Sequence, residues 1–163
     1  MKIYLLIVLF LSLTTAGFLK ANSLKRKVKE IQCLISLLEN IKTRLGYFKS
    51  PVYVILSQAV GDIKGSKTLS SFKINLKKEE NVKKAWLETD CENLLGEDTC
   101  FVLDEFFSLL GTSGVEGQVN LCENTLVKLN HCLENSILSL NEKGKLYQSI
   151  GVLAGAFGVI LFI

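Results

Sequence analysis

This 163-residue chain has an apolar run without charged side chains near each end, and this feature restricts its fold more than any other. The first apolar run covers residues 3–19 and the last covers 150–163. A membrane-spanning helix needs roughly 17–25 apolar residues, so the first run is just long enough. The last run nearly spans when it is extended back to Leu146. We therefore predict transmembrane helices at 3–19 and 149–163, with one domain at 20–148 between them.

Basic residues flank both runs on the side that faces the middle of the chain. Positive flanks mark the cytoplasmic side of a membrane span. We therefore expect residues 20–148 in the cytoplasm and both termini on the other side of the membrane. The flanking residues are Lys20, Lys25, Arg26, Lys27 and Lys29 after the first run, and Lys143 and Lys145 before the second.

The last run also carries small residues at a spacing of four. Such spacing lets two membrane helices approach closely, and Ala16 and Gly17 make the first run a natural partner. The small residues are Gly151, Ala154, Gly155 and Gly158.

An exported protein is the main alternative to this topology. Lys2 and the Thr-Ala-Gly sequence at 15–17 also fit a cleaved signal peptide. The chain would then be an exported helical bundle with a C-terminal membrane tail. A membrane scaffold of unrelated function also remains open.

The middle of the chain has the pattern of helices. Pro51 is the only proline, and apolar residues recur at steps of three and four. The predicted fold is all-α, an antiparallel helical bundle between the two terminal transmembrane helices, with Trp86 in its core. We predict a loop at 61–71 and helices at 23–47, 52–60, 79–95, 98–110 and from 115 into the C-terminal run.

The five cysteines favour a reducing compartment. Their number is odd and no Cys-x-x-Cys occurs, which is untypical of a disulfide framework or a zinc site. Each lies among apolar neighbours, where a free thiol packs like a small hydrophobic side chain. We therefore expect free cysteines in a cytoplasmic domain.

The sequence offers no candidate for catalysis. His131 is the only histidine, and adjacent helical residues such as His131 and Cys132 point about 100° apart, so they cannot form a nucleophile–base pair. Phosphate-loop, calcium and zinc spacings do not occur. We expect no catalytic, cofactor-binding or metal-binding residue and no small-molecule substrate, and a net charge of +3 is too mild for nucleic-acid binding.

Several short segments resemble the stage III sporulation protein AB family of endospore-forming bacteria. The resemblance covers nearly the whole chain, and the last block is the most specific part. The turn departs from the family pattern at Gly114, where an acidic residue commonly follows the serine. The segments are LGYFKSP at 45–51, KAW at 84–86, the turn at 107–118, NEK at 141–143 and SIGVLAG at 149–155.

This resemblance implies a function. The family's soluble domain is similar to the cytoplasmic domain of platform proteins in type II secretion and type IV pilus machines. The chain would then be a non-enzymatic component of the channel between mother cell and forespore, in the mother-cell membrane. Its partners would be the family's secretion-type ATPase, stage III sporulation protein AA, and the other membrane subunits.

Two surfaces are candidates for binding such partners. The first is the turn before the long last helix, represented by Ser113 and Gln118. The second is the basic helix surface of Lys25, Arg26 and Lys29, although attraction to anionic lipid headgroups explains the same charges.

Overall fold

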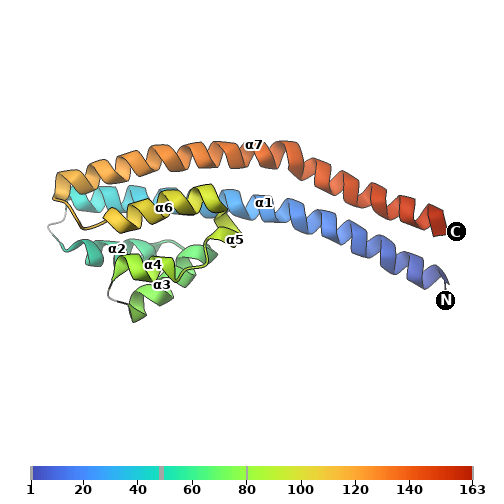
Figure 1. Cartoon of the computed structure of the whole chain (residues 1–163), viewed down its shortest axis with the longest axis horizontal. Coiled ribbons are helices and arrows are strands. Elements are labelled where there is room, and N and C mark those ends of the chain that lie inside the picture. Colours follow the sequence, from blue (N-terminus) through green and yellow to red (C-terminus); the bar gives the residue numbers. More distant parts are fainter. Residues whose placement is uncertain (1, 48–49, 80, 163) are drawn as a thin grey trace. The chain divides into compact units, whose positions relative to one another are not determined.

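The computed structural model is all helical, which confirms the predicted fold class, and the described residues contain no strand. It describes the backbone of residues 2–47, 50–79 and 81–162, and all side chains there except those of residues 2–7, 9, 13, 148, 155 and 158–162. The chain divides into two compact units, one of residues 28–134 and one of residues 1–27 with 135–163. The helices are α1 (Lys2–Tyr47), α2 (Val52–Asp62), α3 (Lys67–Lys78), α4 (Val82–Leu87), α5 (Glu92–Leu95), α6 (Glu97–Leu109) and α7 (Val115–Phe162) (Figure 1).

Three predicted boundaries are wrong. The helix predicted to start at Ser23 is the continuation of α1, and the Ser23 hydroxyl donates to the Lys20 carbonyl oxygen (2.7 Å) instead of capping a helix start. The predicted loop at 61–71 contains the start of α3. The predicted helix at 79–95 is divided into α4 and α5.

A buried carboxylate explains why α3 begins where it does. Ser66 caps the helix by accepting from the Leu69 amide (3.0 Å). Glu30 of α1, only 6% exposed, accepts from the Ser66 hydroxyl and from the Lys67 amide (2.8 Å). Together they satisfy amides that every helix leaves unpaired at its start, and negative charge is favourable there. The partner that fixes this helix is therefore 36 residues away in the sequence.

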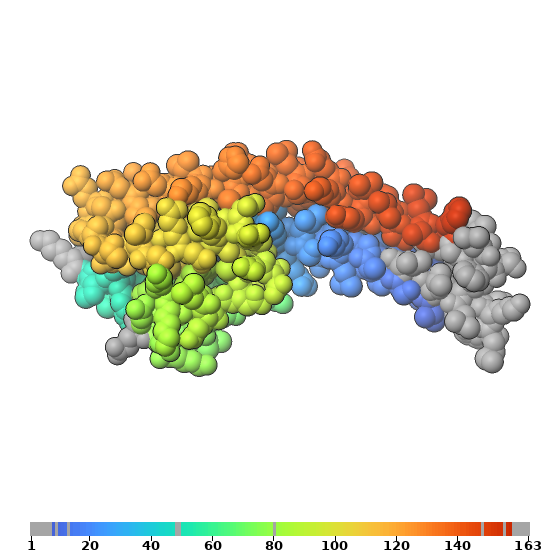
Figure 2. Space-filling view, in the orientation of Figure 1, coloured from blue at the N-terminus to red at the C-terminus, as the bar shows by residue number. Residues whose placement is uncertain are grey.

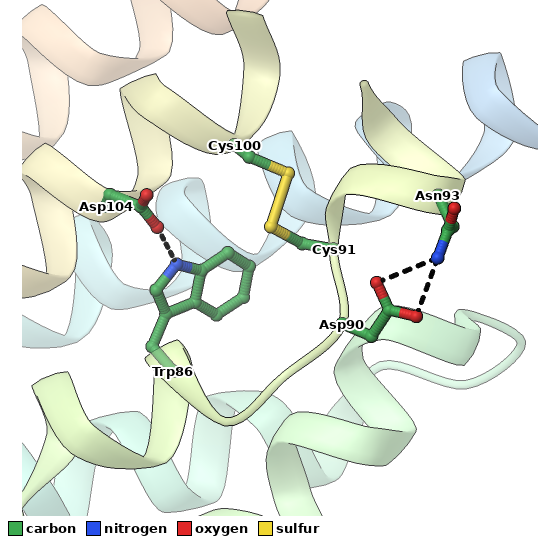
Figure 3. Close-up of a disulfide and its surroundings, with 6 residues drawn as sticks. All are labelled: Trp86, Asp90, Cys91, Asn93, Cys100 and Asp104. Carbon is green, nitrogen blue, oxygen red and sulfur yellow. Dashed lines mark hydrogen bonds between the residues drawn. A yellow bond between two sulfur atoms is a disulfide. The ribbon is translucent and has the colours of Figure 1, made fainter. Parts of the chain in front are cut away.

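The core of the 28–134 unit follows the apolar stripe predicted for the first soluble helix. Ile31, Leu38 and Ile41 are fully buried. Trp86 is also buried, as predicted, and its ring stacks on Phe107 with centroids 4.5 Å apart. Its indole N–H donates to Asp104 Oδ1 (2.6 Å), so the polar edge of the ring is satisfied inside the core (Figure 3).

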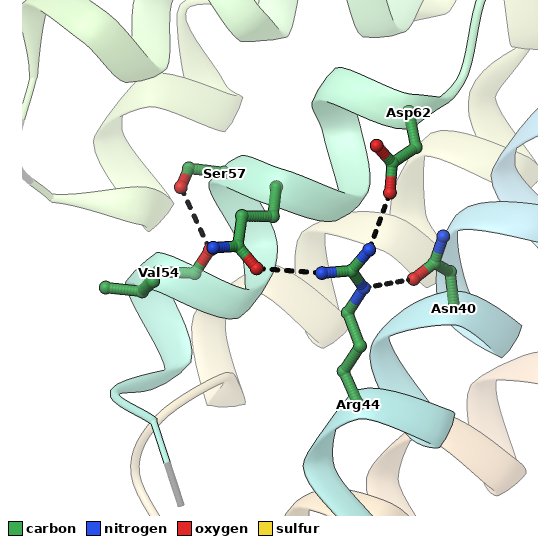
Figure 4. Close-up of polar contacts among 6 residues, drawn as sticks. Asn40, Arg44, Val54, Ser57 and Asp62 are labelled. Carbon is green, nitrogen blue, oxygen red and sulfur yellow. Dashed lines mark hydrogen bonds and ion pairs between the residues drawn. The ribbon is translucent and has the colours of Figure 1, made fainter. Parts of the chain in front are cut away.

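Arg44 joins α1 to α2 by hydrogen bonds to three side chains. Its guanidinium donates to Asn40 Oδ1 (2.6 Å), to Gln58 Oε1 (2.8 Å) and to Asp62 Oδ2 (2.6 Å) (Figure 4). Asn40 lies one turn before Arg44 on α1, whereas Gln58 and Asp62 lie on α2. The planar fork of an arginine suits such a multiple contact, which sets the angle between the two helices.

One cysteine prediction is wrong. Cys91 and Cys100 form a disulfide in this structure, with Cα atoms 6.1 Å apart (Figure 3). Cys33, Cys122 and Cys132 are free thiols. The bond links the start of α5 to α6. The two cysteines are nine residues apart in the sequence, and this spacing alone does not show that their side chains meet.

The other unit consists of the two terminal helical segments. At Gly17 the two helices approach so closely that a Cβ would lie 2.6 Å from the Tyr147 carbonyl oxygen and 3.0 Å from Gly151 Cα. Gly151 is buried and Ala154 is exposed. The surroundings of Gly155 and Gly158 lie outside the described residues. Within the residues that the structure describes, no helix combines the length and apolarity that a membrane crossing requires.

Candidate partner-binding site

The turn between α6 and α7 is tight. Helix α6 ends at Leu109, and α7 begins at Val115. Gly111 has a φ of +86°, a backbone conformation that other residues adopt only with strain. The amide and the hydroxyl of Thr112 both donate to the Leu109 carbonyl oxygen, at 3.2 and 2.8 Å. The end of α6 is therefore closed by backbone and side-chain hydrogen bonds together.

Gln118 holds this turn from inside. Its side chain is only 1% exposed. Its Oε1 accepts from the Gly111 amide (2.9 Å), and its Nε2 donates to Ser113 Oγ (2.7 Å) and to the Leu109 carbonyl oxygen (3.4 Å). A single buried amide thus serves both helix ends, and an acidic residue at position 114 is not needed to close the turn.

These bonds change the roles of the two residues that the sequence selected. Gln118 is buried and shapes the turn from inside, whereas Ser113 is exposed and its hydroxyl accepts a hydrogen bond from Gln118. The large apolar side chains that the turn exposes are Leu109, 45% exposed, and Val115, 56% exposed. The sequence does not indicate that either is exposed, because apolar residues at helix ends resemble members of the buried stripe.

The basic residues selected from the sequence are exposed within about one turn of α1. Lys25 and Arg26 are exposed and belong to the terminal unit, whereas Lys29 belongs to the 28–134 unit. The Lys29 ammonium lies over the loop before α3. A Cβ added at Gly65 of this loop would lie 3.6 Å from Lys29 Nζ. The structure therefore places Lys29 beside the α3 cap, in a structural position.

Lys29 is also distant from the α6–α7 turn. Lys42 pairs with Glu123 of α7 (2.7 Å), and α1 runs antiparallel to α7 in this unit (Figure 1). Lys29 lies thirteen residues before Lys42, which is ~20 Å along a helix. The turn lies beyond Lys42 in the other direction, so the two candidate surfaces are separate.

Helix α7 carries the single histidine of the sequence and the buried thiol of Cys122. His131 is exposed on α7. Burial raises the pKa of the Cys122 thiol to about 11, against a smaller opposite effect of nearby Lys42, so this thiol stays protonated at neutral pH. Among the described residues, no three side chains of the His, Cys, Asp or Glu type are grouped to hold a metal ion.

Comparison with known proteins gives one result. The family model for stage III sporulation protein AB matches residues 2–163. No curated protein and no solved structure matches the chain. The match includes both terminal segments, the α6–α7 turn and the middle unit without interruption. The chain therefore belongs to the stage III sporulation protein AB family, which gives it a role in sporulation.

Proposed function

We propose that this chain is a non-enzymatic membrane subunit of the channel complex between mother cell and forespore, and that it docks the complex's secretion-type ATPase, stage III sporulation protein AA. Residues 3–19 and 149–163 would be tethers in the mother-cell membrane around the forespore. Residues 20–148 would lie in the mother-cell cytoplasm. The docked ATPase would pass its nucleotide-driven motion through α7 to the other membrane subunits.

The composition of the terminal unit's surface supports a membrane setting. Large apolar side chains that would normally be buried are exposed along both of its helices. They include Val8, Leu11, Phe18 and Leu19 on α1, and Ile150, Leu153 and Phe157 on α7. The close approach at Gly17 is the geometry by which small residues let membrane helices pack. Basic residues on both inner flanks support the cytoplasmic orientation.

The observation that carries the docking proposal is the construction of the α6–α7 turn. Gln118 fixes the turn from inside, and Leu109 and Val115 expose apolar surface on it. Exposed apolar side chains on a rigid support bind partners well, because little conformational entropy is lost on association. A rigid turn at the start of a 48-residue helix also suits the transmission of motion.

A binding experiment tests this proposal. The purified full chain, in mild detergent, is titrated with the AA ATPase while co-migration and ATP hydrolysis are measured. We expect Leu109→Ser with Val115→Ser to weaken binding by about tenfold or more, since central apolar contacts dominate interface energies. Leu87→Ser is the control, because Leu87 is also an exposed apolar side chain (62%) but lies on α4, away from the turn. Unchanged binding and hydrolysis by the double variant would refute docking at this turn.

The disulfide favours a second candidate, the exported helical bundle with a cleaved signal peptide and a C-terminal membrane tail. A Cys91–Cys100 bond persists in an oxidising compartment, whereas the proposed cytoplasmic location keeps both as thiols. Acid-quenched alkylation of sporulating cells, followed by intact-mass measurement, separates the two. The membrane-subunit proposal predicts five alkylated cysteines and an intact N-terminal segment. The exported form predicts three alkylated cysteines and a processed N-terminus.

A further inference from the structure

Charge is segregated along the middle of the chain. Residues 85–127 contain nine acidic and no basic residues. Residues 64–84 contain seven lysines and two glutamates. Both stretches belong to the same 28–134 unit, so one compact body carries an acidic and a basic surface.

The acidic stretch borders an apolar groove between α6 and α7. Phe101 of α6 and Val127 of α7 line it, and each is 71% exposed. Glu97 and Asp98, both exposed, stand at the end where α6 begins. The groove has a volume of about 560 Å³. In Figure 2 the surface of α6 is yellow and that of α7 is orange.

The basic side chain in this groove is already paired. Lys128 lies in an ion pair with Glu105 of α6, with its Nζ 2.6 Å from the carboxylate. The pair bridges α6 and α7 and largely cancels its own charge. Glu97 and Asp98 therefore give the groove a negative charge. A complementary partner must bring an apolar side chain flanked by cations.

Helix α3 of this same chain presents that combination. Ile74 is 56% exposed, although α3 buries Leu69, Phe72 and Leu76 on its other side. Lys77 and Lys78 are exposed three and four residues after Ile74, so they share its face of the helix.

The two surfaces face different directions on the unit. Helix α3 packs against α2 and α4, and α4 packs against α6, so α4 separates the α3 surface from α6. In Figure 1, α3 lies on the side of this unit away from α7. The groove and the α3 surface of one molecule therefore cannot meet each other, but those of two molecules can.

We propose that the α6–α7 groove of one copy receives the Ile74 face of α3 from a second copy. Ile74 would contact Phe101 and Val127, and Lys77 and Lys78 would lie against Glu97 and Asp98. A second copy is the occupant that the charges favour, because the complementary surface is present on this chain itself. The contact needs neither a membrane nor an ATPase.

Such a contact joins two different surfaces, so it repeats. A head-to-tail interface gives a ring if its rotation closes and an open row of subunits if it does not. Exposed ion pairs are weak individually and are screened by salt. The association is therefore expected to be modest in affinity and to decrease steeply as salt is raised.

A charge swap tests the contact. Sedimentation velocity of the purified full chain in mild detergent is measured from low to high salt. Glu97→Lys with Asp98→Lys, and separately Lys77→Glu with Lys78→Glu, are each expected to reduce self-association by at least tenfold. A mixture of the two double variants restores it, because the reversed groove then meets a reversed α3 surface and the native groove meets a native one.

The control reverses two acidic residues away from the groove, Glu88→Lys with Glu92→Lys. Its change in net charge is the same as that of the Glu97→Lys, Asp98→Lys variant. This control is expected to associate like the wild type. All replaced side chains are exposed, and circular dichroism verifies that each variant is folded. A wild type that stays monomeric at low salt, equal losses in the control, or no restoration in the mixture would each overturn the proposal.

Discussion

Glu30 and Gln118 are buried polar side chains that complete the hydrogen bonds of a helix other than their own. Glu30 belongs to α1 but caps α3, and Gln118 belongs to α7 but closes the end of α6. Neither role follows from a local pattern, because Glu30 resembles any other charged residue of an amphipathic helix. When a substitution removes the oxygen atoms of a buried acceptor, its donors are left unpaired. Each unpaired donor lowers the free energy of unfolding by about 1–3 kcal/mol.

We predict that Glu30→Ala destabilises the middle unit by about 2–4 kcal/mol, because the Ser66 hydroxyl and the Lys67 amide lose their acceptor inside the protein. Urea unfolding of the full chain, followed by the fluorescence of the single tryptophan, measures the change. Glu39→Ala, at an exposed position of the same helix, is the control and should alter stability by less than about 0.5 kcal/mol. Equal stabilities of the two variants would contradict the capping role.

Cys122 gives a prediction about alkaline pH. Burial raises its pKa from an ordinary value of 9.0 to about 11. The unfolded chain therefore releases this proton at lower pH than the folded chain, and stability falls as pH rises from 9 to 11. The contribution is complete below pH 9. We expect Cys122→Ala to lose less stability than the wild type between pH 9 and 11, measured by urea unfolding at each pH. If the stabilities of the two proteins fall in parallel over this pH range, the Cys122 thiol does not contribute to the loss of stability.

Among the helices, the sequence predicts the ones that carry long apolar repeats. The stripe of α1, the extent of α6 and the whole of α7 were predicted to within a few residues, because each repeats over several turns. Helix α3 was missed, since Gly61, Gly65 and the polar residues around them are typical of a loop. Its start depends on Glu30, a non-local partner that periodicity cannot reveal.

The candidate site was located only approximately. The segment from Gly111 to Gly114 forms a tight turn between α6 and α7, as predicted. Which side chains face outward depends on where Gln118 points, and this depends on the packing of α6 against α7. The sequence therefore predicts the turn but not the exposure of Leu109 and Val115.

Two glycines of this turn make a matched pair. Gly111 has a φ of +86°, whereas Gly114 has no such conformation and open space where a Cβ would lie. We predict that Gly111→Ala destabilises the chain by about 1–2 kcal/mol through backbone strain, and that Gly114→Ala changes stability by less than about 0.5 kcal/mol. Thermal unfolding by circular dichroism compares the two. Equal effects would contradict the strained geometry at position 111.

At the scale of the whole molecule, the family match and the surface of the terminal unit support the same setting. The middle unit has a well-packed core, whereas the two helices of the terminal unit expose large apolar side chains. A lipid environment would cover those side chains, and the flanking lysines and arginine would remain in the cytoplasm. The ATPase proposal requires this orientation, because the proposed ATPase would dock from the cytoplasm.

Thiol labelling tests this orientation most directly. The chain is produced in vegetative cells, where it would enter the cell membrane, and a membrane-impermeant maleimide is added from outside. Cys33 and Cys132 are half-buried free thiols of the middle unit. We predict that they react only after permeabilisation, whereas a cysteine added after Ile163 reacts in intact cells. Labelling of Cys33 or Cys132 in intact cells would contradict a cytoplasmic middle domain and the function proposed from it.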